Sequence, residues 1–398
     1  MSSFGNTLKG MISGNFKGAI ADIASYVSYF QVTMKAIQQA KQGFNDFLNF
    51  QKDLTNISYT MNLSPDQLQN LGTSAIDMAK DLSMSLDNTM DIYKIYANMN
   101  TTASEIQQTA RPTAILSNLS GVDASTAADQ VQGILQQFHM LEDGSTTAAD
   151  ASMHIVDVLD KVSGSVGIDY AKGIKIISDA VQASGQVAYD AGMSYEQLAA
   201  ITAKVSERTR EDGSSIGNAL KTIITRTTKV GKMPQYADEV DNATLSNASA
   251  SLHAIGVDVY NPDGSDRGII TVMSELKDKW DDLTDAQQAK IAFDVAATRQ
   301  TSKFKSMLDA FTDSMSLAEE ATTANGNAEA NQEKYMESTA GKLQAIKTQM
   351  QDFWVNFYNS GTVNGVLEFV HSLTEGFTSL EKNHLDQYRH YLLLYLQQ

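Results

Sequence analysis

The sequence predicts a mainly α protein: a multi-helix array of short capped helices with one small β-hairpin, flanked by longer coiled-coil-like helices. Three observations lead to this fold class. Only 4 of the 398 residues are proline, while alanine, leucine, methionine and glutamine, which favour helix, are common. Apolar residues recur at three- and four-residue spacing along most of the chain. The segments that carry them are separated by Gly or Asn followed by Ser, Thr or Asp, which is typical of helix ends and starts.

Composition also limits the classes of function. Hydrophobic residues make up 42% of the chain, which is enough for a packed core. There are 30 Lys and Arg against 47 Asp and Glu, so the formal net charge is -17 and we expect no direct binding to nucleic acid. Cysteine is absent, which excludes disulfides, thiolate metal sites and cysteine nucleophiles.

No segment has the pattern of a signal peptide or of a membrane span. The apolar stretch "GAIADIASYVSYF" is interrupted by Asp22 and lacks a basic flank and a cleavage site. The longest apolar run is "YLLLYL" at residues 391–396, whereas a spanning helix needs about 20 residues.

Residues 1–60 are predicted to contain a long amphipathic helix with a coiled-coil seam. Apolar residues occupy the a and d positions of a heptad, namely Ile20, Ile23, Val27, Phe30, Met34, Ile37, Phe44 and Leu48. Lys41 stands at an expected apolar position, which would weaken a symmetric pairing of two copies. An ordinary amphipathic helix that packs on the following domain is an equal alternative, because charged e and g pairs are sparse.

Residues 61–320 are predicted to form a core domain of many helices. Three helix starts have the spacing of a capping box, in which a hydroxyl residue is followed three positions later by Gln or Glu. These pairs are Ser64 with Gln67, Thr102 with Glu105, and Ser194 with Gln197. Pro65 strengthens the first start, because proline is favoured at the first helical position. The connections are short, so neighbouring helices are expected to pack as hairpins.

One segment of this core, "IGVDVYNPDGSDRGIITV" at residues 255–272, has a strand-like pattern. Ile255, Val257 and Val259 alternate with other residues, and "NPDG" is typical of a turn with Pro at its second position. We therefore expect a small β-hairpin here.

The same segment contains three acidic residues that resemble calcium ligands, Asp258, Asp263 and Asp266. When Gly264 is aligned with the glycine of an EF-hand, Ile270 stands where the bidentate Glu is required. The calcium motif therefore fails, and an exposed turn is the favoured interpretation.

Residues 321–398 are predicted to form C-terminal helices. The polar stretch "ATTANGNAEANQEKYMES" at residues 321–338 is interpreted as a hinge. Three/four spacing then resumes at Leu343, Ile346, Met350, Phe353 and Phe357. After a break at "NSGTVNG" it continues at Val363, Val366, Val370, Leu373, Phe377 and Leu380.

A search for chemistry predicts no catalytic residues, no cofactor site and no metal site, and therefore no enzyme. "GSSIGNALK" and "AGKLQ" lack the spacing and the Lys-Ser/Thr pair of a phosphate loop, and no nucleophile-elbow or zinc-protease motif occurs. The 6 histidines are scattered, at His139, His154, His253, His371, His384 and His390. Trp280, Trp354 and most of the 17 methionines are interpreted as core or interface residues.

Several segments follow one another in a defined order along residues 70–310. They are "LGTSAIDMAKDL", "YANMNTTASEIQQTARPTAILSNLSGVDASTAADQVQGIL", "AADASMHIVDVLDKVSGSVGIDYAKGIKIISDAVQASGQVAYDAGMSYEQLAAITAKVSERT", "GSSIGNALKTIITRTTKV", "LHAIGVDVYNPDG" and "AFDVAATRQTSKFKSMLDAF". In this order they resemble the core region of phage tail tape measure proteins of siphophages, myophages and prophages. "AGKLQAIKTQMQDFWVNFYNSGTVNGVLEFVHSL" resembles the stretch that usually follows this core.

The resemblance implies a structural protein rather than an enzyme. It implies a scaffold around which tail tube subunits assemble, which sets the tail length and leaves the tube during DNA ejection. The implied partners are the tail tube protein, the tail assembly chaperones and the distal tail or baseplate proteins. Self-association through the N-terminal helix is a further option, and contact with a host membrane is expected only during ejection. The implied location is the lumen of the virion tail, after assembly in the host cytoplasm.

Two features depart from this family. Its members are usually much longer, and at about 1.5 Å per helical residue this chain reaches at most roughly 600 Å. The final stretch "KNHLDQYRHYLLLYLQQ" matches nothing expected of the family, and a truncated end would explain it. The alternative from another class is a bacterial helical membrane-active or toxin-like protein without enzymatic activity. It would need a hidden apolar hairpin, and none is long enough.

Overall fold

The fold is known from a computed structural model, which describes residues 42–43, 45–99, 101–142, 144, 146–233, 235 and 242–359. The chain divides into two compact units. The larger comprises residues 56–345, and the smaller combines residues 1–55 with residues 346–398. The domain boundaries predicted from the sequence, at residues 60 and 320, remain a prediction.

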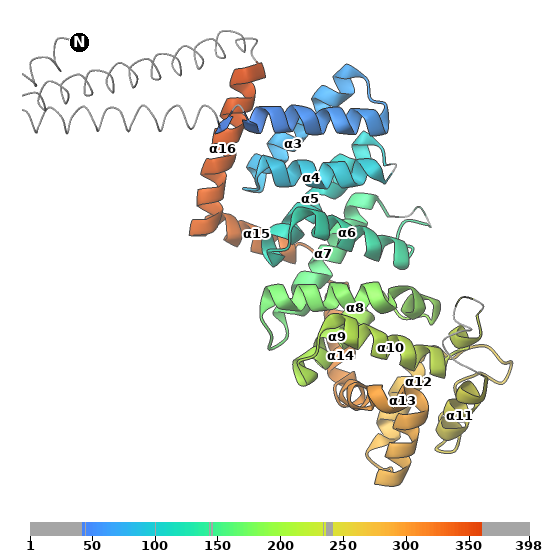
Figure 1. The fold of residues 1–398 in the computed structure, drawn as a ribbon. Helices are drawn as coiled ribbons and strands as arrows, with labels where there is room; N and C mark the ends of the chain where they lie inside the picture. Colours follow the sequence, from blue (N-terminus) through green and yellow to red (C-terminus); the bar gives the residue numbers. More distant parts are fainter. Residues whose placement is uncertain are drawn as a thin grey trace, which may run out of the picture. The chain divides into compact units, whose positions relative to one another are not determined.

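The larger unit is built from helices with short connections (Figure 1). In chain order they are α3 (Pro65–Asp81), α4 (Leu86–Asn98), α5 (Ala103–Ser120), α6 (Ala124–Gln137), α7 (Ala148–Gly164), α8 (Tyr170–Asp190), α9 (Tyr195–Thr209), α10 (Gly213–Thr227), the 3-10 turn η1 (Lys229–Lys232), α11 (Asn242–His253), α12 (Ile269–Trp280), α13 (Asp285–Asp309), α14 (Phe311–Thr322) and α15 (Asn327–Glu337). A further helix, α16 (Thr339–Asn359), leads into the smaller unit, where residues 45–55 are also helical. The predicted α class is therefore confirmed in the described part of the chain.

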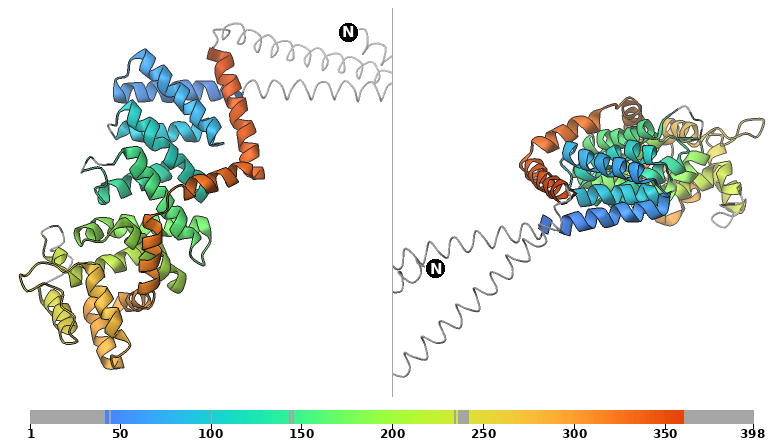
Figure 2. Two further views of the ribbon diagram at one scale, coloured as in Figure 1. Left: turned by 180° about the vertical axis from the view of Figure 1, so that it is seen from behind. Right: turned by 90° about the horizontal axis from the view of Figure 1, so that it is seen from above.

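Helices α3 to α8 are stacked one after another in chain order, α9 to α13 continue beyond α8, and α14 and α15 return along the stack (Figures 1 and 2). Helix α14 packs on α9 and α7, and α15 packs on α7 and α5. Helices that are far apart in the sequence therefore lie side by side. Their attachment depends on contacts between side chains, because no short connection joins them.

All three predicted capping boxes are present. The hydroxyls of Ser64, Thr102 and Ser194 each accept the backbone N–H three residues later, and the Gln or Glu at that position accepts the N–H of the cap. Thr284 and Gln287 make a fourth capping box at the start of α13. Each box satisfies two backbone donors that a helix start otherwise leaves unpaired.

The core of the larger unit is apolar and closely packed. Trp280, predicted to be a core or interface residue, is 4% exposed, and its ring meets that of Phe304 edge-on at 5.8 Å. Methionines such as Met84, Met90 and Met273 are fully buried among aliphatic side chains. Burial of this kind is the main favourable contribution to folding.

The predicted β-hairpin at residues 255–272 is wrong. Tyr260 and Asp266 form one isolated antiparallel bridge, and the described residues contain no strand. From Ile269 onward the chain is helix α12 rather than a second strand. A lone bridge satisfies too few backbone groups to form a ladder.

The alternating pattern that suggested this hairpin has another cause. Val257 is 0% exposed and Val259 is 4% exposed, so both side chains fill the helical core from an extended loop. The predicted turn does form, because the Gly264 N–H donates to the Asn261 carbonyl oxygen at 2.8 Å.

The predicted seams lie only partly within the described residues. The stripe at residues 20–37, together with Lys41 and Phe44, lies outside them, as do the stripe at residues 363–380 and the tip at residues 391–396. Leu48, within the described part, is 46% exposed. The polar stretch interpreted as a hinge contains α15, an ordered helix that packs on α5 and α7.

Candidate functional site

Two buried carboxylates on α7 hold the start of α15. The carboxylate oxygens of Asp157, which is 2% exposed, accept the N–H groups of Gly326 and Ala328 at 2.9 Å each. Both oxygens of Asp160 accept the side-chain amide of Asn331, also at 2.9 Å. These five residues are called the polar latch below. They join two helices that are about 170 positions apart in the sequence.

In the polar latch the hydrogen-bond acceptors are carboxylates on α7, and the donors belong to α15 and the residue before it. Asp157 lies at the N-terminus of α15, where the helix dipole favours negative charge. Burial nevertheless raises the pKa of Asp157, against the lowering effect of the two backbone hydrogen bonds. Tyr170 donates its hydroxyl proton to Asp160, and burial together with this carboxylate raises the pKa of Tyr170. Tyr170 therefore remains a donor over the ordinary pH range.

A second set of polar contacts joins α15 to α3 and α5. Gln332, which is 2% exposed, donates to the Leu82 carbonyl oxygen at 2.9 Å. Asn118 donates to the same oxygen at 2.9 Å. Leu82 follows the last residue of α3, so the two amides satisfy a carbonyl at a helix end. Helix α15 thus fixes three earlier helices of the stack.

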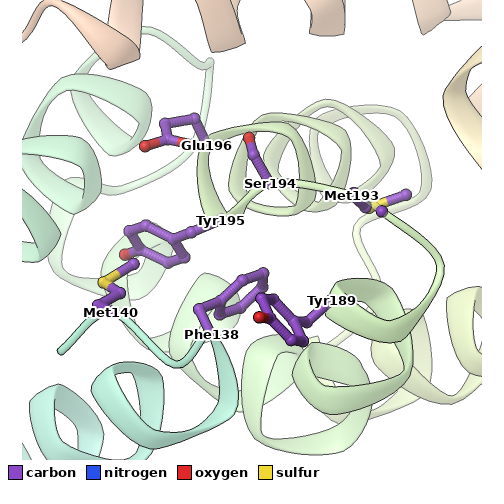
Figure 3. A pocket seen from close by; sticks show the side chains of 8 residues that line it. Phe138, Met140, Tyr189, Met193, Ser194, Tyr195 and Glu196 are labelled. Atoms are coloured by element: carbon purple, nitrogen blue, oxygen red, sulfur yellow. The ribbon is translucent and has the colours of Figure 1, made fainter. Parts of the chain in front are cut away.

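An open hollow of about 370 Å³ lies where α6 ends and α9 begins. Figure 3 shows the rings of Phe138, Tyr189 and Tyr195 around it, with Met140 beside Tyr195. The Phe138 ring meets those of Tyr195 and Tyr189 edge-on, at 5.6 Å and 6.3 Å. A concave surface lined by rings and a thioether is suited to an apolar side chain of a partner.

The polar rim of this hollow contains Ser194 and Glu196, and Glu196 is paired with His154. His154 Nε2 lies 2.6 Å from Glu196 Oε1. Burial disfavours the charged form of Glu196, but hydrogen bonds from His154 and Ser194 outweigh it and lower the pKa of Glu196. The carboxylate thus stands between the hydroxyl and the imidazole. In a nucleophilic triad the imidazole contacts the hydroxyl instead, so this order of contacts supports a structural role.

The remaining histidines in the described part of the chain pair singly with carboxylates. His139 Nδ1 lies 2.5 Å from Glu142, and His253 Nδ1 lies 2.6 Å from Asp258. Within the described residues, no three His, Asp or Glu side chains are grouped so that they could hold a metal ion. His371, His384 and His390 lie outside the described residues.

The acidic residues of the 255–272 loop also have separate partners. Asp263 accepts the N–H of Ser265 at 2.9 Å, and Asp266 accepts the N–H of Lys229 at 3.0 Å. Asp258 pairs with His253 as described above. These carboxylates organise the loop and its neighbours, and they do not converge on one point.

Helix α16 has a stripe of apolar residues whose side chains are exposed in part. Four residues of the predicted seam are more than two-fifths exposed, namely Leu343 (57%), Ile346 (55%), Met350 (43%) and Phe353 (58%). The side chain of Phe357 lies outside the described residues. A continuous apolar stripe on a helix is typical of an interaction surface.

The comparison with known families decides what kind of protein carries these features. The family described as phage-related minor tail protein matches residues 72–297, which is more than half of the chain. The chain belongs to this family. The match lies within the larger unit, begins in α3, and ends at Ala297, where α13 is kinked by a positive φ of 56°. No solved structure matches the chain.

Membership of the phage-related minor tail protein family supports a structural role in a phage tail, as a virion component that contacts other tail proteins. Among the described residues, no helix is both long enough and apolar enough to cross a membrane. The polar latch is the feature that sequence reasoning missed. Its signal was present in "MHIVDVLDKV", where two carboxylates three positions apart interrupt an otherwise apolar helix.

Proposed function

We propose that this minor tail protein is a tape measure protein, a scaffold on which the tail tube assembles and which sets the length of the tail. The observation that supports it is the family match, which covers a helical body flanked on both sides by amphipathic stretches. The proposed partners are the tail tube protein, the tail assembly chaperones and the distal tail or baseplate proteins. The proposed location is the lumen of the tail tube, with assembly in the host cytoplasm and release during DNA ejection.

The described surfaces suit a scaffold. The exposed apolar side chains of α16, such as Leu343 and Ile346, and the hollow beside Tyr189 both offer apolar area to a protein partner. The polar latch holds distant helices together through buried hydrogen bonds, so the body keeps one arrangement while partners bind. The formal charge of -17 limits adhesion to the DNA that shares the tube.

A change in tail length tests this proposal. Seventy helix-forming residues are inserted in frame directly after residue 398 in the phage that encodes the chain, and the tails are measured by electron microscopy. At about 1.5 Å per helical residue, tails should lengthen by about 100 Å. An insertion of half that size should give about half of the increase.

Tails of unchanged length from both insertions would contradict the proposal. They would leave the chain as a tail component that does not measure length. Mass spectrometry of intact and of emptied particles provides a second readout, because a tape measure protein should be present in the first and absent from the second.

A further inference from the structure

Helix α13 contains a kink that its own sequence does not explain. Its 25 residues, Asp285–Asp309, include neither proline nor glycine, which are the usual causes of a sharp bend. At Ala297 the backbone nevertheless has φ 56° and ψ 168°. This conformation is almost restricted to glycine, so Ala297 is strained. The local sequence therefore favours one continuous helix, and contacts from outside α13 must hold the bend.

The position of Ala297 distinguishes it from other residues with a positive φ. Among the residues that the structure describes, five residues other than glycine have a positive φ. Four of them, Asn62, Ser83, His139 and Arg210, lie just after the end of a helix, where a left-handed residue helps to terminate it. Ala297 instead lies within a helix. Its strained conformation terminates nothing, so it brings no local benefit.

The half of α13 before the kink is bonded to α10 and α11. Lys290 Nζ lies 2.8 Å from Ser251 Oγ on α11 and 2.6 Å from Asp294 Oδ2, and Ser251 donates to the Asp294 carboxylate. Arg226 on α10 donates to the backbone carbonyl oxygen of Asp294 at 3.4 Å. This carbonyl lies shortly before Ala297. A side chain that reaches into the backbone of a helix in this way is a known cause of kinks.

The half of α13 after the kink has different partners. Lys303, which is 8% exposed, pairs with Glu211 in the connection between α9 and α10 at 2.7 Å. Arg208 on α9 donates to the Asp309 carbonyl oxygen at 3.4 Å. Because the two halves are bonded to different parts of the larger unit, the bend lasts only while both sets of contacts hold.

We propose that α13 is a conformational switch with two states, a kinked state and a straight state in which residues 285–309 form one continuous helix. Relief of the strain at Ala297 favours the straight state, whereas the contacts of Arg226 and Lys303 favour the kinked state. Loss of the Arg226 contact removes a hydrogen bond from a charged group, which shifts the balance toward the straight helix. Straightening moves the two ends of α13 further apart.

Replacement of Ala297 in the full chain tests the strain. Glycine adopts the kinked conformation freely, so Ala297→Gly should raise the folding equilibrium constant, measured by urea denaturation, about threefold or more. The matched control is Ala289→Gly, at an exposed position of the same helix with helical backbone angles. There glycine should lower the constant about fivefold. If both variants lower it, Ala297 is not strained and the proposal is overturned.

Distances between two spin labels test for the straight state. The natural sequence has no cysteine, so Ala286→Cys and Lys305→Cys place one label on an exposed position of each half. The backbones at these positions lie about 28 Å apart in a straight helix and closer together in a kinked one. The labelled chain should show mainly the shorter distance. Adding Arg226→Met should raise the population at the longer distance about fivefold or more.

Two further variants make this second test specific. Arg299→Met removes the same charge from an exposed residue beside the kink, and it should leave the distances unchanged. Ala297→Gly added to Arg226→Met should restore the shorter distance, because the strain that favours straightening is gone.

Three results of the distance measurements would overturn the proposal: unchanged distances in Arg226→Met, an equal change in Arg299→Met, or no restoration by glycine. The comparison of Ala297→Gly with Ala289→Gly does not involve Arg226, so it still decides about the strain if Arg226→Met fails to fold. None of these readouts depends on tail assembly.

Discussion

Helix α10 meets α8 through Gly217, whereas α15 meets α7 through Asp157 and Asp160. A Cβ at residue 217 would lie 2.6 Å from the Ala180 carbonyl oxygen and 2.9 Å from the Ala180 Cα, so the two backbones are in contact. The buried face of α10 is otherwise mostly aliphatic, with Ile223 among its fully buried residues. At α15 the buried residues are Ala328 and Gln332, and hydrogen bonds attach the helix to α7 and to the end of α3.

The free energy needed to separate the helices and expose them to water should differ between the two interfaces. Separation of α8 from α10 exposes apolar surface, and its cost grows with the area exposed. Separation of α15 from α7 exchanges protein hydrogen bonds for hydrogen bonds to water, so its net cost is small per bond. The polar interface is therefore specific but easily opened, while the apolar interface opens only when the larger unit unfolds.

The largest effect is expected from Asp157→Asn, which breaks the polar interface. The asparagine amide has one acceptor oxygen, so either the Gly326 or the Ala328 N–H would face another donor. We expect the free energy of unfolding to fall by about 2–3 kcal/mol, measured by urea denaturation. The control is Asp278→Asn on the exposed side of α12, expected to change it by less than about 0.5 kcal/mol. Equal effects of the two variants would show that the latch adds no stability.

Gly217→Ala tests the apolar interface. The added methyl group meets backbone atoms of α8 that cannot move aside, so we expect a loss of about 1–3 kcal/mol. The matched control is Gly133→Ala in α6, where an added Cβ has no heavy atom within 4 Å. There the higher helix propensity of alanine should raise the free energy of unfolding by about 0.5–1 kcal/mol. A stabilising effect at both positions would mean that α8 and α10 are not in backbone contact.

A smaller effect is expected from pH, with opposite signs for two buried carboxylates. Burial raises the pKa of Asp157 above its ordinary value of 3.8, so the folded protein binds that proton more tightly than the unfolded chain. The stability difference between wild type and Asp157→Asn should therefore grow as pH falls through the raised pKa. Hydrogen bonds outweigh burial at Glu196 and lower its pKa below 4.5. The difference between wild type and Glu196→Gln should accordingly shrink as pH falls through that lowered pKa.

Urea midpoints at pH 7, 5, 4 and 3 would measure both differences. If the two change in the same direction, at least one of the assigned pKa shifts has the wrong sign.

The comparison also explains how much of the fold could be predicted from the sequence. Capping boxes such as Ser194 with Gln197 were predicted because donor and acceptor lie three residues apart, so spacing alone specifies them. The polar latch was missed because its partners are separated by 169 and 171 positions, and no local pattern reports such a contact. The hairpin was wrongly predicted because Val257 and Val259 alternate as in a strand but are buried by helices. Local rules indicate where helices begin, and tertiary packing determines what covers them.

For the candidate surfaces, the pattern of apolar residues was more informative than the motifs for chemistry. The spacing of Ile346, Met350 and Phe353 predicted one helical stripe, and in the structure these three side chains are between 43% and 58% exposed. The hollow beside Tyr189 could not be predicted, because it is formed by the ends of separate helices.

Native-state hydrogen exchange of the full chain at low denaturant concentrations is the most direct test of the difference between the two interfaces. Backbone amides of residues 326–337 should exchange through a local opening, with a lower free energy and little dependence on denaturant. Amides of residues 213–227 should exchange only with a steep dependence on denaturant, as in unfolding of the larger unit. If both sets exchange with the same free energy and the same steep dependence, α15 does not open separately, and the distinction between a polar and an apolar interface is contradicted.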